Sequence, residues 1–326
     1  MESDDDSRLR SSYKLTGTDT FRLASSENAF GRGGNLQNIP SGKETAIEVN
    51  FKFPNVREQF EPDVGYELAE FDLSGADAQT VAWEADDADL KDAFRRGLKL
   101  HLKNARDVYP DKTRDMSDKD ITEGQAHEGG IYSNVKKLAH GTNFGGTPKG
   151  LAERIRISVR DAEEFQERWF YLHPGIRDWH NRTNQILQGI KCWRCYEFIH
   201  GEPICPHCQA FPQGRTIGNK FGYRIIYFNR VHELFNESLA WVPQSTTAIN
   251  CNKGALALID RVPWVELLMQ VHDSLIVQYP IKYSDRLGDI KDALHSVKVP
   301  YADPLTIPWD AKVSRVSWGK CEKVKW

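Results

Sequence analysis

The chain has 326 residues, of which 40% are hydrophobic and 27% charged, and its formal net charge is −3. This composition excludes a disordered tail and a membrane-spanning protein, because the chain can bury a core and has no run of about 18 apolar residues. The first residues, Met1–Asp6, are acidic, where a secretory signal needs a basic flank followed by an apolar stretch. The length suffices for roughly two domains, and the charge balance neither requires nor excludes a nucleic-acid partner.

The predicted elements mix helices and strands. Residues 1–41, rich in Ser, Gly, Asn and Asp, predict irregular backbone, and residues 107–130 predict polar helix and loop. Helices are expected where apolar residues recur at helical spacing, over 76–96 with a break near 86–89, 132–143, 160–172, 176–187 and 243–259. Strands are expected over 66–72 and 221–228, and a hairpin with polar residues at its tip over 265–279.

Two aspartates lie at the ends of predicted strands. Asp72 ends the strand over 66–72, and Asp273 lies at the hairpin tip, 201 residues later. Two carboxylates that converge at a sheet edge repel each other unless a divalent cation lies between them, and Mg²⁺ prefers carboxylate and phosphate oxygens. The pair is therefore a candidate two-metal site, which can activate a 3′-hydroxyl and stabilise a leaving pyrophosphate. The alternative for either residue is an ordinary solvated surface aspartate.

The helix predicted over 132–143 carries a candidate nucleotide site. Lys136, His140 and Phe144 are spaced by four residues, which places a cation, an imidazole and an aromatic ring on one face. Such a face can hold a triphosphate at its basic end and stack a base or sugar on its ring. Residues 134–160 contain six Lys and Arg against one acidic residue. The alternative is an ordinary amphipathic helix with a solvated basic side.

Four of the six cysteines form one cluster. Cys192 and Cys195 are separated by two residues, nine residues follow, and Cys205 and Cys208 repeat the spacing. Thiolates at this spacing can surround one tetrahedral Zn²⁺, so a zinc-knuckle insert with one structural ion is predicted over 191–214. Two disulfides or four unbonded thiols are the alternatives. The clustering, without a secretory signal, favours the reducing cytoplasm.

Together these pieces resemble the polymerase core of the family A DNA polymerases, especially their phage branch. The similar segments are 21–26 (FRLASS) and 33–40 (GGNLQNIP) ahead of the first catalytic motif, 72–77 (DLSGAD, motif A), 136–145 (KKLAHGTNFG, motif B), 240–246 (AWVPQST, between B and C) and 270–275 (QVHDSL, motif C). They occur in the family's order and cover nearly the whole chain.

The resemblance implies an α+β fold, a polymerase right hand with an antiparallel palm sheet and helical fingers. Residues 1–100 are expected to form the N-terminal palm with motif A, 101–190 the fingers with motif B, 191–214 the zinc insert, and 215–326 the C-terminal palm with motif C. The family's thumb and proofreading exonuclease lie upstream of these motifs. Both are therefore expected to be absent here, so the chain is either a shortened polymerase or one part of a split polymerase whose partner chain carries them. The initial Met favours the split polymerase.

The resemblance also assigns roles to individual residues. Asp72 and Asp273 would be the catalytic carboxylates and, with the backbone carbonyl of Leu73, would bind two Mg²⁺ ions. The residues expected to face the incoming dNTP are Lys136, His140, Phe144, Asp77 and Leu73. The residues expected to line the primer–template DNA are Arg22, Asn35, Gln37, Asn38, Gln244 and His272.

The implied activity is template-directed DNA synthesis, in the host cytoplasm if a phage encodes the chain. His140 replaces the family's usual phosphate-binding Lys, and Asp77 is shorter than the usual Glu, so nucleotide binding is expected to be tuned differently. Two alternatives stay open. One is a non-catalytic, zinc-bearing primer–template binding subunit, and the other is a single-subunit RNA polymerase, since those enzymes share the palm and can carry His-Asp-Ser in motif C.

Overall fold

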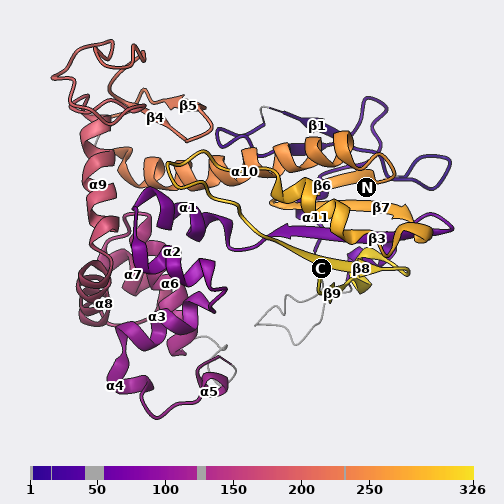
Figure 1. Ribbon diagram of the computed structural model, residues 1–326, viewed down its shortest axis with the longest axis horizontal. Coiled ribbons are helices and arrows are strands. Elements are labelled where there is room, and N and C mark those ends of the chain that lie inside the picture. The colour runs from indigo at the N-terminus through magenta and orange to yellow at the C-terminus, as the bar shows by residue number, and fades with distance from the viewer. Residues whose placement is uncertain (1–2, 16, 41–54, 123–129, 231–232) are drawn as a thin grey trace. The chain divides into compact units, whose positions relative to one another are not determined.

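The computed structural model describes residues 3–15, 17–40, 55–122, 130–230 and 233–326 (Figure 1). The chain forms two compact units, one from residues 1–76 and 244–326 and the other from residues 77–243. We call them the sheet unit and the helical unit. The predicted α+β class is confirmed. No helix in the described part of the chain combines the length and apolar character needed to cross a bilayer.

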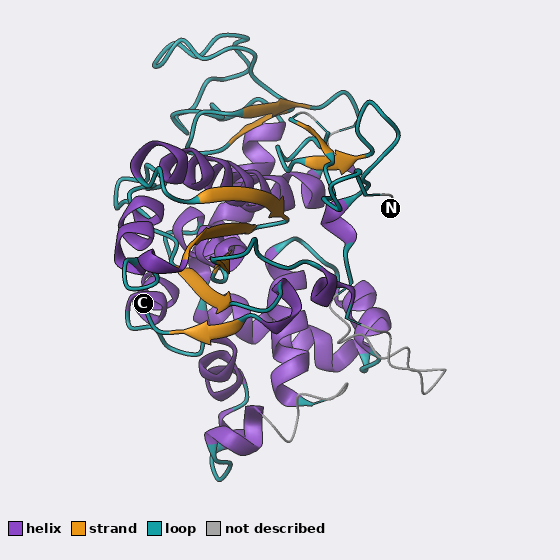
Figure 2. Ribbon diagram, turned by 90° about the vertical axis from the view of Figure 1, so that its right-hand side faces the viewer, coloured by secondary structure: helices purple, strands orange, loops and turns teal. Residues whose placement is uncertain are grey.

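The sheet unit is built on five antiparallel strands in the order β6-β7-β3-β8-β9 (Figure 2). Their bounds are β3 (Tyr66–Leu73), β6 (Glu266–Val271), β7 (Ser274–Pro280), β8 (Trp309–Ser314) and β9 (Glu322–Val324). The central strand β3 is buried on both faces, since Leu68 and Glu70 on one face are as inaccessible as Ala69 and Phe71 on the other. A strand that is covered on both faces and paired on both edges holds its terminal residues rigidly.

Short elements and two helices complete the sheet unit. They are β1 (Ser12–Lys14), β2 (Ala24–Ser26), η1 (Leu36–Asn38), η2 (Val56–Gln59), η4 (Ile281–Tyr283), η5 (Trp318–Lys320), α11 (Leu287–His295) and the C-terminal part of α10 (Phe235–Arg261). Helix α10 passes close to β8, because a Cβ at Gly254 would lie 2.9 Å from the Trp309 ring. This packing requires a residue without a side chain.

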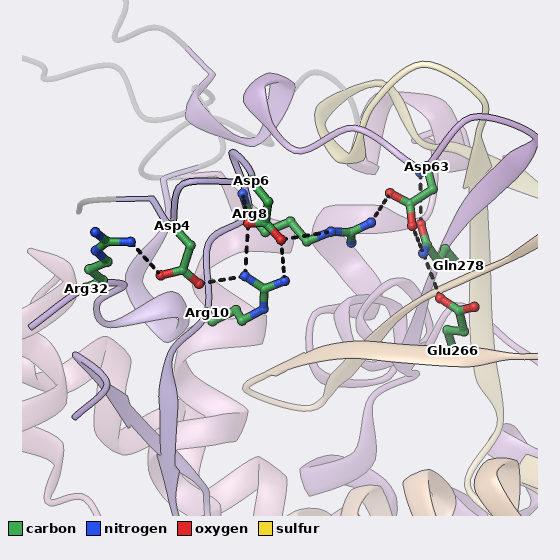
Figure 3. Close-up of polar contacts among 8 residues, drawn as sticks. All are labelled: Asp4, Asp6, Arg8, Arg10, Arg32, Asp63, Glu266 and Gln278. Atoms are coloured by element: carbon green, nitrogen blue, oxygen red, sulfur yellow. Dashed lines mark hydrogen bonds and ion pairs between the residues drawn. The ribbon is translucent and has the colours of Figure 1, made fainter. Parts of the chain in front are cut away.

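A chain of polar contacts ties the N-terminal segment to the sheet (Figure 3). Arg10 binds Asp6 at 2.7 Å, and Arg8 binds Asp63 at 2.7 Å. Asp63 in turn accepts a hydrogen bond of 2.8 Å from the Gln278 amide on β7. The guanidinium of Arg10 lowers the pKa of Asp6 to about 2. Because most of these groups are exposed, the network orients the segment more than it stabilises the fold.

The helical unit consists of nine helices before α10 within the described residues, and one short hairpin. The helices are α1 (Ala76–Glu84), α2 (Ala88–Arg95), α3 (Leu100–Val108), α4 (Pro110–Thr113), α5 (Asp118–Thr122), α6 (Ile131–Asn143), α7 (Pro148–Ile155), α8 (Val159–Leu172) and α9 (Pro174–Leu187). Strands β4 (Thr216–Gly218) and β5 (Arg224–Ile226) form the hairpin. Side chains cap several N-termini, as where Asp87 accepts from the Leu90 N–H at 2.8 Å.

Several predicted elements are confirmed within two residues, namely the strand over 66–72, the helices over 132–143, 160–172 and 176–187, and the hairpin over 265–279. The break near 86–89 separates α1 from α2 as predicted. In these elements apolar residues recur at the spacing of a helix or a strand, and capping or turn residues mark the ends.

Two element predictions were wrong. The strand over 221–228 shrinks to β5, because the chain turns at Gly222 with φ of +89°. Helix α10 begins at Phe235 rather than Pro243, which lies inside the helix. Proline is usually a first-turn residue because it lacks an N–H, and tertiary packing overrides that preference here.

Other elements were missed, namely the hairpin of β1 and β2 within the predicted irregular start, and β4, β8, β9, α3, α7 and α11. The compact units divide the chain after Ala76 and after Pro243, while the finer division at residues 100, 190 and 214 stays a prediction.

Candidate functional site

Asp72 and Asp273 lie together at one end of the β3–β7 strand pair. Asp72 is opposite Ser274 in the register, and the Leu73 N–H donates to the Asp273 carbonyl at 3.2 Å. The Ser274 hydroxyl donates to the Asp72 carboxylate. Both aspartates are half-buried rather than solvated. The structure thus supplies the convergence that the sequence pattern left open.

The electrostatics of this pair favour a cation. Burial raises the pKa of Asp72, the Ser274 hydroxyl lowers it, and the negative charge of Asp273 raises it, with a net increase. Two partly desolvated carboxylates therefore repel each other, and a divalent cation would remove the repulsion. Hard oxygen donors from two carboxylates and a neighbouring backbone carbonyl fit Mg²⁺ better than a thiophilic metal.

Gln37 holds the turn that carries Asp273. Its Oε1 accepts from the His272 N–H at 2.6 Å, and its Nε2 donates to the Gln270 carbonyl at 2.8 Å. His272 has φ of 56°, a left-handed conformation that a residue with a side chain keeps only when its surroundings fix it. The hydroxyl of Tyr13 also donates to the Gln270 carbonyl, at 3.1 Å. Gln37 is therefore a positioning residue for the turn, and its contact with DNA stays a prediction.

The other residues predicted to contact DNA also lie in the sheet unit. The Asn35 side chain caps η1 by accepting from the Gln37 N–H at 3.0 Å, and it also accepts from the Ser25 hydroxyl at 3.1 Å. Asn38 and His272 are exposed, whereas Arg22 and Gln244 are half-buried. Exposure leaves Asn38 and the His272 ring accessible to a ligand.

The predicted nucleotide face forms on α6. Lys136 and His140 are exposed one turn apart, and Phe144 follows the last helical residue as the C-cap. The rings of His140 and Phe144 meet edge to face, with centroids 4.5 Å apart and an interplanar angle of 89°. The chain leaves the helix through Gly145, whose φ of +75° and close approach to Asn236 Oδ1, 2.5 Å from an added Cβ, require glycine. The shared face is thus present.

The imidazole of His140 is neutral at neutral pH. Partial burial lowers its pKa below the ordinary value of 6.5, the carboxylate of Asp77 opposes this shift, and the charges of Arg154 and Lys136 add to it. A bound anion would favour the charged form instead. The site can therefore gain positive charge when a phosphate arrives.

The pattern analysis missed His101 on α3. It lines one pocket with Asp77, His140 and Phe144. Burial lowers the pKa of His101 to about 4, with further lowering by the charges of Lys136 and His140, and its Nδ1 is buried without a hydrogen-bond partner among the described residues. A single histidine near a helix start gives no sequence signal that separates it from a surface histidine.

The two Cys-x-x-Cys segments form the same turn twice. The residue after each pair, Tyr196 or Gln209, donates its N–H to the carbonyl of the first cysteine, Cys192 or Cys205, at 3.0 and 2.9 Å. Both of these following residues are left-handed, with φ of 66° and 58°. Repeating one loop conformation points the sulfur atoms of both segments toward a common centre.

The four sulfur atoms have the spacing of a metal site. Cys192 and Cys208 Sγ are 3.6 Å apart, as are Cys195 and Cys205 Sγ, and all four lie within 4.8 Å of one another. A disulfide needs about 2.05 Å, whereas sulfur atoms around one Zn²⁺, each at about 2.3 Å, stand roughly 3.8 Å apart. Burial raises the pKa values of Cys195 and Cys208, while backbone N–H groups lower that of Cys205. The sulfur spacing favours a shared ion over disulfides.

The family model and the similar proteins found by comparison with known proteins agree with one another. The family model of DNA polymerase family A matches residues 1–192. DNA polymerase I of Geobacillus stearothermophilus is 32% identical over 303 residues, 90% of this chain and 29% of that protein. DNA polymerase I of Bacillus caldotenax is 25% identical over 316 residues, 94% of this chain and 31% of that protein. The chain thus spans less than one third of the length of these curated relatives.

A solved structure shares the fold. The POL domain of Pol1 from M. smegmatis, in complex with DNA primer-template and dNTP, matches with a TM-score of 0.69 and 22% sequence identity. The match covers 98% of this chain and 49% of that chain. It extends beyond residue 192, so the fold of the C-terminal part is shared as well.

We predict that Asp72→Asn stabilises the metal-free protein. A raised carboxyl pKa means that the folded state binds the proton more tightly than the unfolded chain, so stability falls as pH rises through that raised pKa. The Tm of Asp72→Asn should exceed that of the wild type by a few degrees at about pH 7.5, and the difference should vanish near about pH 4. Differential scanning fluorimetry in a chelator measures both.

The control is Asp285→Asn, which changes an exposed aspartate with no shared carboxylate site and should leave Tm unchanged. Adding Mg²⁺ should raise the Tm of the wild type but not that of Asp72→Asn. An Asp72→Asn protein that is less stable than the wild type at every pH would contradict the carboxylate repulsion.

Proposed function

The chain belongs to DNA polymerase family A, and from this membership we propose that it catalyses template-directed addition of dNTPs to a primer 3′-hydroxyl. The observation that carries the proposal is the pairing of Asp72 with Asp273 at the end of β3 and β7. The relatives named above are DNA polymerases, and the M. smegmatis domain was solved with primer-template and dNTP. Those properties support the same activity for this chain.

In the proposed mechanism the primer 3′-oxygen attacks the α-phosphorus of the dNTP, and pyrophosphate leaves. Asp72, Asp273 and the Leu73 carbonyl would hold two Mg²⁺ ions, which increase the nucleophilicity of the 3′-oxygen and neutralise charge on the leaving group. The protein's contribution is to keep both carboxylates in place. The hydrogen bonds from Ser274 and the Leu73 N–H do so on β7 and β3.

The helical unit supplies the proposed nucleotide-binding groups. Lys136, His140 and His101 would bind the triphosphate, since all three are basic groups that influence one another's charge. The Phe144 ring would stack on the base or sugar. Asp77 lines the same pocket and would crowd a 2′-hydroxyl, which favours dNTPs over NTPs.

The DNA path and the wider assembly are also proposals. The residues proposed to line the primer–template are Arg22, Asn35, Gln37, Asn38, Gln244 and His272. The curated relatives are about three times as long as their match to this chain. A thumb and a proofreading exonuclease on a separate chain stay predictions from the family resemblance. A phage origin and action in the host cytoplasm stay predictions from the motif variants.

We further propose that Cys192, Cys195, Cys205 and Cys208 bind one structural Zn²⁺. The repeated loop conformation and the sulfur spacing support it. Four protein ligands leave no open position for a substrate, so the ion would stabilise the insert rather than take part in catalysis.

The two alternatives predict different behaviour. A non-catalytic binding subunit has no need for a repulsive carboxylate pair, so the presence of both Asp72 and Asp273 argues against it. An RNA polymerase would use NTPs, whereas Asp77 and family membership favour dNTPs. Comparing dNTPs with NTPs in one extension assay discriminates between DNA and RNA synthesis.

The central test is primer extension with Mg²⁺ and dNTPs by the purified chain. Asp273→Ala should reduce the rate on the order of 10³-fold, because it removes a charge that stabilises the transition state through the metal. The matched control, Asp285→Ala, changes an exposed aspartate of the same unit and should keep full activity. Extension that survives in Asp273→Ala would refute the assigned active site.

We predict that His140→Lys strengthens dNTP binding at alkaline pH. The lowered pKa leaves the wild-type imidazole neutral there, so the wild-type KM for dNTP should rise as the pH increases from below about 6.5, while Lys keeps its charge. At about pH 8 the variant should have a KM about fivefold lower, the difference between a charged and a neutral hydrogen bond. Steady-state kinetics over this pH range measure the effect.

Lys137→Gln is the control for His140→Lys, because Lys137 is exposed on α6 but lies outside the face of Lys136 and His140. It should leave the pH profile of KM unchanged. If His140→Lys retains the wild-type profile, His140 does not contact the triphosphate.

We predict one zinc ion per chain, measured by elemental analysis of protein purified under reducing conditions. Cys205→Ser should lose the ion and lower Tm by several degrees, because a small insert without its metal has little core of its own. Cys321→Ser, which changes a cysteine in the sheet unit outside the cluster, should retain one zinc. Zinc-free wild-type protein with reduced thiols would rule out the metal site.

A further inference from the structure

The segment 189–230, which contains the cysteine insert and the β4–β5 hairpin, carries a net positive charge. It has six Lys and Arg and two acidic residues, a balance of +4, whereas the whole chain has −3. Four thiolates around one Zn²⁺ would contribute −2 and still leave the segment positive.

Exposed cationic and apolar side chains occur along β5 and directly after it. Arg224 and Ile226 lie on one side of β5, because alternate side chains of a strand share a face. Phe228 and Arg230 follow the strand and are exposed as well, whereas Tyr227 is buried. Phe228 is 88% exposed, an unusual position for a phenylalanine on a folded unit.

The insert adds aromatic rings beside this face. Arg224 donates to the Phe211 carbonyl and lies 5.7 Å from the centre of the Trp193 ring. Trp193 also packs on the hairpin, since a Cβ at Gly218 would lie 2.5 Å from its ring. Phe211 itself is 55% exposed. The insert and the hairpin thus form one surface.

We propose that this surface, defined by Phe211, Arg224, Ile226, Phe228 and Arg230, binds single-stranded nucleic acid. Exposed rings provide planes on which unpaired bases stack, and neighbouring arginine side chains neutralise phosphates. The net charge of +4 over residues 189–230 is complementary to a polyanion, which favours a nucleic acid over a protein partner.

The proposal goes beyond nucleotide addition and does not depend on it. None of these residues belongs to the proposed catalytic or nucleotide-binding groups. Binding can therefore be measured without Mg²⁺ and without dNTPs, and Asp273→Ala should bind single strands as the wild type does. Failure of the polymerase proposal would leave this result unchanged.

The test is fluorescence anisotropy of a labelled oligothymidylate of about 16 nucleotides, titrated with the zinc-loaded full chain. Phe228→Ala should weaken binding about tenfold, the typical effect of removing one stacking ring. The matched control is Tyr171→Ala on α8, which removes a ring that is 76% exposed in the same unit but outside the proposed surface. It should leave the affinity unchanged.

A second variant examines the charge. Arg230→Gln should reduce the slope of log affinity against log salt concentration by about 0.7, the value for one phosphate contact on a single strand. Equal affinities of Phe228→Ala and the wild type, or equal losses in Phe228→Ala and Tyr171→Ala, would overturn the proposal. An unchanged affinity would assign the exposed rings to a protein partner instead.

Discussion

The repulsion between Asp72 and Asp273 is the constraint around which the sheet unit is organised. The strands place two half-buried carboxylates together. Burial and the negative charge of Asp273 raise the pKa of Asp72, while the Ser274 hydroxyl and the charge of Lys312 only partly offset this. The surrounding contacts resist the separation that this repulsion favours, namely the Ser274 hydroxyl, the Leu73 N–H and the amide of Gln37 on the turn. A site that is unfavourable by itself and favourable with a cation is typical of metal-dependent chemistry.

The helical unit also brings groups of like charge together, but these groups are basic. Burial and neighbouring cations lower the pKa values of His101 and His140, so both imidazoles are neutral in the free protein. The unit thus avoids placing two further positive charges beside Lys136 when no ligand is bound. An arriving triphosphate would make protonation favourable, which couples nucleotide binding to proton uptake. The Phe144 ring, in edge contact with His140, links the anion-binding end of this face to its apolar end.

The insert relies on local geometry more than on a large core. Two identical turns orient four sulfur atoms, and Trp193 packs the resulting loop on the β4–β5 hairpin. A metal ion would fix this arrangement at a size where hydrophobic burial alone contributes little stability. The same arrangement leaves Phe211 and Phe228 exposed beside arginine side chains. A rigid scaffold with protruding rings suits recognition of flexible strands, since the protein then loses little conformational entropy on binding.

Features determined by short-range rules were readable from the sequence. The Cys-x-x-Cys spacing predicts a tight turn. The spacing of four residues places Lys136 and His140 on one face of a helix. The two apolar runs of the hairpin place Asp273 at its tip. The tertiary structure alone decided the rest. The bonds from Gln37 to the turn join residues more than 230 positions apart, His101 meets His140 only when α3 packs near α6, and Pro243 lies inside a helix because packing outweighs its local preference. Local patterns show the secondary-structure propensity of a segment and the spacing of its apolar residues. They do not show which distant groups share a pocket, because that depends on how whole elements bury their apolar faces.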